Sequence, residues 1–229
     1  MTKRSIIIGA TGGIGSAFAR ALSAQHGAGS VIGLSRASGD IDLTNEASIA
    51  AAAARCAQGS PPDIVIVATG MLHGALGGPE KSLRELDANR LADAFAINVI
   101  GPALVAKHFL PLFARDKRCV FAALSARVGS ISDNRIGGWY GYRAAKAALN
   151  MTIRNLAIEL GRTHKQALCV GLHPGTVDTA LSEPFQKNVA PERLFTPDYA
   201  ATRMLSVLDQ LTPADSGKCF AWDGAEIQP

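Results

Sequence analysis

Short apolar runs alternate with longer amphipathic stretches from one end of the chain to the other. The short runs are β-branched or otherwise apolar and are bounded by glycine, proline or polar residues, which favours strands. The predicted strands are Arg4–Ile8, Ser30–Leu34, Asp63–Val67, Cys119–Leu124, Ala167–Leu172 and Lys218–Ala221. Because these runs are almost continuously apolar rather than alternating, we expect a parallel sheet that is buried on both faces.

The longer stretches have helical spacing, most clearly Tyr140–Arg162, where apolar residues recur on one face. The predicted helices are Ile14–Gln25, Asn45–Gln58, Asp87–Arg115, Tyr140–Arg162 and Pro197–Leu211. Strand–helix alternation without repeats predicts an α/β fold, in which a doubly wound parallel sheet of about seven strands has helices on both faces. We expect one Rossmann-type domain over residues 1–229, with Ser182–Phe195 as a mobile loop over the site.

Composition adds exclusions rather than a function. Of the 229 residues, 48% are hydrophobic and 18% charged, which is typical of a globular protein. The net charge of +4 is mild and no basic stretch suggests a nucleic-acid partner. No apolar run reaches the roughly 18–20 residues that cross a bilayer, and no signal-peptide pattern follows Met1. We therefore expect a cytoplasmic protein that binds neither membrane nor nucleic acid.

The cysteines and histidines do not form a metal site. The four cysteines are scattered without a CxxC pair, so we expect buried free thiols at Cys56, Cys119, Cys169 and Cys219. Four histidines are isolated and are expected on surfaces or loops: His26, His73, His108 and His164. His173 ends a predicted strand, where it either lines a site or simply packs.

A glycine-rich turn follows the first predicted strand and opens the first helix. Its spacing is G-x-x-x-G-x-G, with glycines at Gly9, Gly13 and Gly15. Such a turn lets the backbone approach a pyrophosphate and points the helix N-terminus at it. Directly after the first strand of a βαβ series, it predicts a dinucleotide site.

The end of the second predicted strand indicates which dinucleotide binds. An acidic residue there would hold the ribose 2′-hydroxyl of NAD(H), whereas this chain has Ser35-Arg36. A guanidinium and a hydroxyl suit a 2′-phosphate through charge-assisted hydrogen bonds. The plainer interpretation is a solvated surface arginine. We expect NADP(H), with NAD(H) as the alternative cofactor.

Tyr142 and Lys146 are four residues apart at the start of a predicted helix, so their side chains share one face. A free tyrosine has a pKa of about 10, and a neighbouring ammonium lowers it toward neutrality. The pair alone is weak evidence, because this spacing arises in many helices by chance.

Several motifs in fixed order give the chain a resemblance to the short-chain dehydrogenase/reductase family over essentially its full length. They are the glycine turn, Asp42-Leu43, Ile66–Gly70, Asn98–Gly101, Leu124-Ser125, Tyr142–Lys146, His173–Thr179 and Asp223-Gly224. Within the family, Ser125–Asn134 with Gly137–Trp139 is similar to the carbonyl-reductase branch that contains sniffer and the C-factor-like signalling proteins.

The resemblance implies a role for each matching residue. Tyr142 would protonate a carbonyl oxygen as the nicotinamide delivers hydride, Lys146 would hold the nicotinamide ribose, and Asn98 would support a water-mediated proton relay. The catalytic set is completed by Ser125. Together with the turn and Ser35-Arg36, the expected cofactor contacts are Gly9, Thr11, Gly12, Gly13, Ile14, Gly15, Ser35, Arg36, Asp42, Leu43, Ala68, Thr69, Gly70, Asn98, Tyr142, Lys146, Pro174, Gly175, Thr176, Val177 and Thr179.

The chain departs from the family pattern at two points. Thr69 stands in Val67–Gly70, where the family usually has asparagines, so a contact there is lost or replaced. The substrate-orienting serine is expected at the position of Ala126. Ser125 is one residue earlier and would face the other way on a regular strand, and Ser130 is a further candidate.

The leading hypothesis is an NADPH-dependent reductase of a small aldehyde or ketone, or the reverse alcohol oxidation. The alternative is a dinucleotide-binding signalling protein with little turnover. We do not expect a sugar-nucleotide epimerase, because 229 residues leave no room for its substrate domain. The resemblance suggests a homodimer or homotetramer packed through Asp87–Arg115 and Tyr140–Arg162. We expect the substrate pocket to draw on Met71–Gly78, Ser130–Trp139 and Ser182–Phe195.

Overall fold

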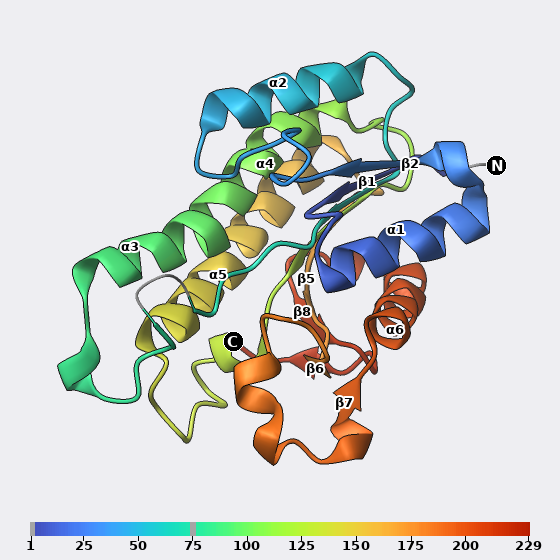
Figure 1. Ribbon diagram of the computed structural model, residues 1–229. Coiled ribbons are helices and arrows are strands. Elements are labelled where there is room, and N and C mark those ends of the chain that lie inside the picture. Colours follow the sequence, from blue (N-terminus) through green and yellow to red (C-terminus); the bar gives the residue numbers. More distant parts are fainter. Residues whose placement is uncertain (1–2, 74–76) are drawn as a thin grey trace.

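A computed structural model describes residues 3–73 and 77–229, and its centre is a seven-stranded sheet (Figure 1). The strands are β1 (Ser5–Ile8), β2 (Val31–Leu34), β3 (Ile64–Val67), β4 (Val120–Leu124), β5 (Leu168–His173), β8 (Cys219–Ala221) and β9 (Glu226–Ile227). Their order is β2-β1-β3-β4-β5-β8-β9, and all neighbours are parallel except β8 and β9. The α/β fold and its six parallel strands confirm the sequence prediction.

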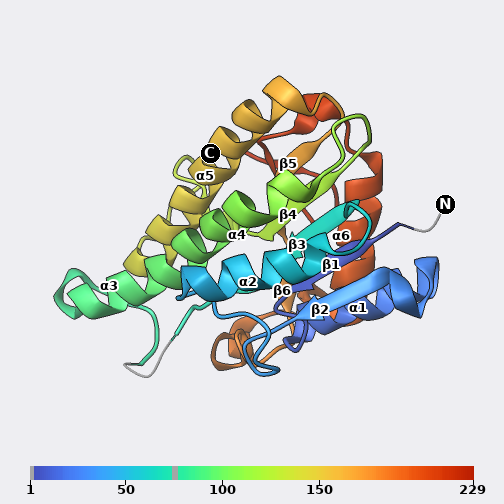
Figure 2. The same ribbon diagram turned by 90° about the horizontal axis from the view of Figure 1, so that it is seen from above.

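Helices cover both faces of the sheet. They are α1 (Gly13–His26), α2 (Glu46–Ala57), α3 (Ala88–Phe95), α4 (Gly101–Phe109), α5 (Tyr140–Thr163) and α6 (Pro197–Gln210). Figures 1 and 2 show α1 and α6 on one face and α2, α4 and α5 on the other. Alternate strand residues divide the core accordingly: Ile7 packs with Phe18 and Met204, whereas Ile6 packs with Phe109 and Leu149.

The expected helix Asp87–Arg115 is interrupted. Between α3 and α4 lies a π-helical turn, Ala96–Ile100, and α4 runs into a 3₁₀ turn at Leu110–Leu112. Pro102 explains part of this break, because proline has no N–H to bond to the carbonyl four residues earlier, which belongs to Asn98. Asn98 therefore lies at a local distortion, a common feature of functional sites.

Two further expectations are corrected. The sheet ends on an antiparallel strand, β9, which is only two residues long and so has no readable sequence pattern. Ser182–Phe195 is not a plain loop: it holds two 3₁₀ helices, Glu183–Asn188 and Pro191–Arg193, and a short strand, β7 (Leu194–Phe195). This strand pairs with β6 (Thr176–Val177) outside the main sheet.

Taken together, the α-, π- and 3₁₀-helical turns of Ala88–Leu112 are long and apolar enough to cross a membrane by length and composition alone, contrary to our expectation that no run is long enough. This run combines 25 residues with a mean hydropathy of 1.4 in its most apolar window. A buried core helix meets the same criteria. In this fold, Val105, Ala106 and Phe109 are fully buried, and α4 lies against α2 and α5.

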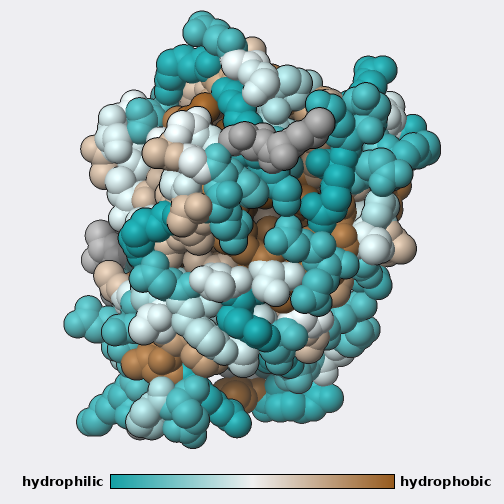
Figure 3. All heavy atoms as spheres, turned by 90° about the vertical axis from the view of Figure 1, so that its right-hand side faces the viewer, coloured by the Kyte–Doolittle hydropathy of each residue, from teal (hydrophilic) through white to brown (hydrophobic). Residues whose placement is uncertain are grey.

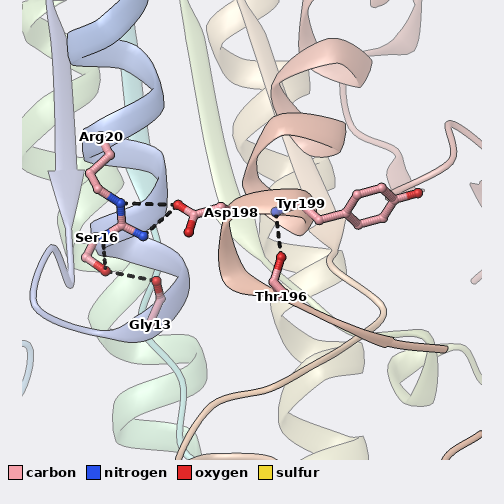
Figure 4. A network of polar contacts seen from close by, with 6 residues as sticks. All are labelled: Gly13, Ser16, Arg20, Thr196, Asp198 and Tyr199. Carbon is pink, nitrogen blue, oxygen red and sulfur yellow. Dashed lines mark hydrogen bonds and ion pairs between the residues drawn. The ribbon is translucent and has the colours of Figure 1, made fainter. Parts of the chain in front are cut away.

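Polar contacts connect α1 to α6 beside the glycine turn (Figure 4). Arg20 reaches Asp198 at 2.6 Å and also donates to the Ser16 hydroxyl at 3.3 Å. Both members of the ion pair are exposed, so it adds little stability. Figure 3 shows the face of the molecule on the right-hand side of Figure 1, where α1 and α6 lie. Hydrophilic side chains cover most of it.

All four cysteines are buried free thiols, as expected. One histidine departs from expectation: His164, at the end of α5, is buried, and its Nδ1 lies 2.8 Å from the Thr163 hydroxyl. The burial of His164 is therefore explained by its position at the C-terminal cap of α5, and it indicates no functional role.

Candidate active site

A cavity of about 810 Å³ opens at the carboxyl ends of the parallel strands. Open α/β sheets bind ligands at this edge, next to the point where the strand order reverses. Here the chain passes from β1 to β2 on one side of that point and from β3 to β4 on the other. Seventeen of the expected site residues line it: Gly9, Thr11, Gly12, Gly13, Ile14, Ser35, Arg36, Asp42, Leu43, Ala68, Thr69, Gly70, Ser125, Tyr142, Lys146, Pro174 and Thr179.

The glycine turn is packed so closely that side chains cannot replace its hydrogens. A Cβ on Gly15 would lie 2.1 Å from the carbonyl oxygen of Gly9, and one on Gly13 would lie 2.6 Å from Thr179 Cγ2. Gly9 itself has a φ of +88°, a conformation that favours glycine. The N–H groups of Gly9 and Ala10 both donate to the carbonyl of Leu34, which holds the turn against β2.

The N-terminus of α1 fits a phosphate group. Its N-cap is Gly12, no side chain caps it, and its first turn has no acidic residue. The first N–H groups and the positive end of the helix dipole therefore face the cavity uncompensated. The Thr69 side chain packs against Gly9 of the turn, and its hydroxyl is buried without a hydrogen-bond partner among the described residues. These features match a dinucleotide pyrophosphate.

The end of β2 presents a hydroxyl and a guanidinium. Arg36 is exposed and lines the cavity. The Ser35 hydroxyl accepts from the backbone N–H of Ser38 at 3.1 Å and lies 2.7 Å from the Ser38 hydroxyl. Across the turn, the backbone N–H and hydroxyl of Thr44 lower the pKa of Asp42 by hydrogen-bonding its carboxylate.

Tyr142 and Lys146 lie together on α5 and face the cavity, as their spacing predicts. The ammonium of Lys146 lies 5.5 Å from the centre of the Tyr142 ring. Lys146 is 2% exposed and donates to the carbonyl of Leu124 at 2.8 Å, at the end of β4. A Cβ added to Gly70, at the end of β3, would lie 3.8 Å from the ammonium and 3.6 Å from Asn98 Oδ1.

The pKa of Tyr142 is shifted opposite to our expectation. Burial raises it to about 12, because the phenolate is poorly solvated. Burial also lowers the pKa of Lys146 to about 8. In the protein alone, the phenol is thus protonated at neutral pH and is suited to donating a proton.

Asn98 is buried in the π-helical turn and has a full set of hydrogen bonds. Its Nδ2 donates to the carbonyls of Met71 and Ala94 at 2.8 and 2.9 Å, and its Oδ1 accepts from the N–H of Met71 at 3.1 Å. These contacts join the turn to the segment after β3. Asn98 does not itself line the cavity.

Ser125 lines the cavity, but its hydroxyl is engaged on the α5 side. It donates to Asn150 Oδ1 at 2.6 Å and is buried. Ser130, the other serine candidate, is also buried. Its oxygen accepts from the N–H of Asp133 at 3.1 Å and lies 3.3 Å from the Ser132 hydroxyl. Ser130 and Ala126 are not among the cavity-lining residues of the described chain.

Other expected residues lie beside the cavity rather than in its wall: Gly15, Asn98, Gly175, Thr176 and Val177. The cofactor set omitted several wall residues: Ile8, Ala37, Ile41, Met71, His73, Ile97, Leu124, Ala180 and Leu181. Most of them are apolar residues that lie next to a predicted contact in the sequence. That neighbouring position is the only feature of the sequence that could have identified them. Residues 74–76 of the expected pocket segment Met71–Gly78 lie outside the described residues.

Sequence comparisons agree with this geometry. Residues 9–209 match the family model described as Enoyl-(Acyl carrier protein) reductase. The chain is 34% identical to the C-signal of Myxococcus xanthus over 146 residues, which cover 64% of this chain and 82% of that protein. It is 31% identical to 1-hydroxy-2-glutathionyl-2-methyl-3-butene dehydrogenase from a Rhodococcus species over 189 residues, which cover 82% of this chain and 78% of that protein.

Structure comparisons cover the whole chain. The crystal structure of an NADPH-bound carbonyl reductase from chicken fatty liver superposes with a TM-score of 0.83 at 25% identity, covering 100% of this chain and 99% of that one. The carbonyl reductase Sniffer of D. melanogaster gives a TM-score of 0.80 at 19% identity, with full coverage of both chains, and supports the fold.

The buried ammonium predicts that Lys146→Met stabilises the protein. The unfolded chain holds this proton up to about pH 10.5 and the folded chain only to about pH 8, so the wild-type protein gains stability as pH rises between these values. At pH 7 the variant should be more stable by on the order of 2 kcal/mol, allowing for its lost hydrogen bond. Urea unfolding from pH 7 to pH 10.5 should show the difference shrinking.

Lys165→Met is the matched control, because Lys165 also donates to a backbone carbonyl but is exposed. It should leave the free energy of unfolding almost unchanged at every pH. A Lys146→Met protein less stable than wild type at pH 7 would contradict the burial penalty.

Proposed function

The chain belongs to the short-chain dehydrogenase/reductase family of oxidoreductases, and we propose that it is an NADPH-dependent reductase of small aldehydes or ketones. The observation that carries the proposal is the pairing of Tyr142 with the buried ammonium of Lys146 at the wall of the dinucleotide-sized cavity. A protein that only bound the nucleotide would need the glycine turn but not this pair. The retained pair therefore favours turnover over the signalling alternative.

The cofactor assignment rests on Arg36 and on the relatives. A guanidinium at the end of β2 complements a 2′-phosphate, and Ser35 and Ser38 add hydroxyls beside it. The superposed carbonyl reductase from chicken fatty liver is described as NADPH-bound, and another superposed short-chain dehydrogenase is described as bound to NADP. The residues of the uncapped α1 N-terminus would hold the pyrophosphate.

In the reduction, NADPH supplies the hydride that adds to the carbonyl carbon of the substrate. The phenol of Tyr142 gives its proton to the carbonyl oxygen, so the substrate gains one hydride and one proton and becomes an alcohol. The raised pKa keeps that proton available at neutral pH. In the reverse direction, the phenolate would take the proton back from the alcohol.

Lys146 and Asn98 would support this transfer. The ammonium lies beside the phenol and stabilises the negative charge left on it after proton donation. Asn98 hydrogen-bonds to the backbone of Met71 and so fixes the segment Gly70-Met71, which lies next to Lys146 in the cavity wall. We propose that a water there returns the proton to Tyr142 through the ammonium.

We further propose a cytoplasmic homo-oligomer. Large apolar side chains stand exposed on the helices expected at the interface: Ile100 is 52% exposed at the start of α4, and Met151 and Ile158 on α5 are 63% and 50% exposed. Burying such side chains against a second copy is favourable, which supports association through α4 and α5.

The mechanism predicts that Tyr142→Phe abolishes reduction but not cofactor binding. The variant keeps the ring and loses only the acidic hydroxyl, so kcat should fall by roughly 100-fold or more. NADPH oxidation with a panel of aldehydes, diketones and quinones measures turnover, and NADPH fluorescence measures binding. Tyr199→Phe, on α6, is the matched control and should behave as wild type. Unchanged turnover in Tyr142→Phe would refute the proposed mechanism.

The proposed 2′-phosphate contact predicts that Arg36→Ala weakens NADPH binding selectively. Loss of a charge-assisted contact corresponds to a rise in the NADPH dissociation constant of about 10- to 100-fold, with little change for NADH. Fluorescence titration with both cofactors measures this. An equal effect on NADPH and NADH would refute the role, and Arg84→Ala serves as a control for charge alone.

The proposed interface predicts that Ile158→Glu shifts the protein toward monomers. Each interface would place a carboxylate in an apolar contact, which is unfavourable. Analytical ultracentrifugation measures the mass in solution. Ile136→Glu, in an exposed loop outside the helices, should leave the mass unchanged, and a monomeric wild-type protein would contradict the proposal.

A further inference from the structure

The site lacks an obvious second hydrogen-bond donor for the substrate oxygen. Tyr142 supplies one donor. Ala126 has no hydroxyl, and the Ser125 hydroxyl donates to Asn150 at 2.6 Å. Ser130 is engaged with Asp133 and Ser132 and does not line the cavity. A carbonyl oxygen that acquires negative charge during reduction is stabilised by more than one donor, so another group is needed.

His73 is in the right place to supply this donor. It follows β3 and lines the large cavity together with Tyr142, and the two residues also share a smaller adjoining cavity of about 40 Å³. Its Nε2 is buried and has no hydrogen-bond partner among the described residues. Buried polar atoms in native proteins are nearly always paired, so an unpaired one on a cavity-lining residue is a candidate for a contact that a ligand completes.

Aromatic rings connect His73 to Tyr142. The ring centre of His73 lies 6.2 Å from that of Phe185, which lies 5.1 Å from Trp139, and Trp139 lies 6.3 Å from Tyr142. The four residues come from the segment after β3, the 3₁₀ helix Glu183–Asn188 and the start of α5. Rings at these distances and angles pack against one another as an aromatic cluster, of which His73 and Tyr142 line the cavity.

The backbone holds Trp139 in this cluster at a conformational cost. It has a φ of +51°, the left-handed region, directly after Gly137 and Gly138, which also have positive φ. Among the described non-glycine residues, it alone has a positive φ. Glu80 fixes the turn: its carbonyl accepts from the N–H of Trp139 at 2.5 Å, and its carboxylate accepts from that of Gly141 at 3.2 Å. Such strain is characteristic of functional sites.

We propose that His73 binds the substrate and donates a hydrogen bond from Nε2 to the same carbonyl oxygen that Tyr142 protonates. His73 thus takes the role that the serine missing at Ala126 would have had. The flat part of an aromatic or conjugated carbonyl compound packs beside the His73 and Tyr142 rings, which Phe185 and Trp139 support from behind. This inference rests on the proposed carbonyl reduction, since it assigns the second contact to that oxygen.

The test compares His73→Phe, which keeps a ring but has no donor, with His73→Gln, which keeps an N–H donor. With 4-nitrobenzaldehyde and NADPH, His73→Phe should lower kcat/KM by about 10- to 100-fold. His73→Gln should recover most of this loss, and the dissociation constant for NADPH should stay within about twofold in both. His108→Phe, on α4, is the matched control and should match wild type.

A binding measurement separates this inference from the proposed function. In the NADP⁺-loaded protein, 4-nitrobenzyl alcohol should shift the side-chain ¹⁵N resonance of His73 and bind less tightly to His73→Phe. If the wild-type protein binds the alcohol in this way but reduces no carbonyl, the proposed function fails while the contact stands. If His73→Phe matches wild type in binding and turnover, or if the alcohol does not bind, the contact is refuted.

Discussion

The buried ammonium of Lys146 is the constraint on which the rest of the site depends. It lies at the meeting point of the ends of β3 and β4, the π-helical turn and α5. Among the described residues, its hydrogen bond to Leu124 satisfies one of its three donors. The backbone that carries it is closely packed, because a Cβ on Gly129 would lie 2.8 Å from the Lys146 backbone. A charge held this way is costly, so its position must be fixed by the surrounding fold.

Several groups at the cavity share this energetic cost of burying charged or polar atoms. Burial pushes the pKa of Tyr142 up and that of Lys146 down, so both groups are displaced toward their uncharged forms when the protein is alone. Thr69 and His73, which line the same cavity, each have a buried polar atom without a partner among the described residues. A ligand that brings phosphate and hydroxyl groups relieves several of these costs together, which couples binding to stability.

The serine of this site stands at Ser125, one residue before the position expected from the family pattern, and this shift changes the direction of its hydroxyl. The peptide N–H of Ser125 donates to Leu172, which keeps this residue in the sheet, and its hydroxyl then turns toward Asn150 beneath α5. The Tyr142 ring packs instead against Trp139, which a hydrogen bond to the Glu80 carbonyl holds in a left-handed conformation. The chemistry of this site therefore depends more on its loops than on β4.

The sequence by itself determined the six parallel strands, the starts of α1, α2, α3, α5 and α6 within one residue, the glycine turn and the Tyr142–Lys146 face. Each follows from patterns within a few residues, such as apolar runs or helical spacing. Only the tertiary structure decided the break at Asn98, the antiparallel β9, the direction of the Ser125 hydroxyl, the raised pKa of Tyr142 and the place of His73 in the cavity wall. These features depend on burial and on residues distant in sequence. Desolvation and hydrogen bonding are set by the groups that the fold brings together, and a local sequence pattern does not specify those groups.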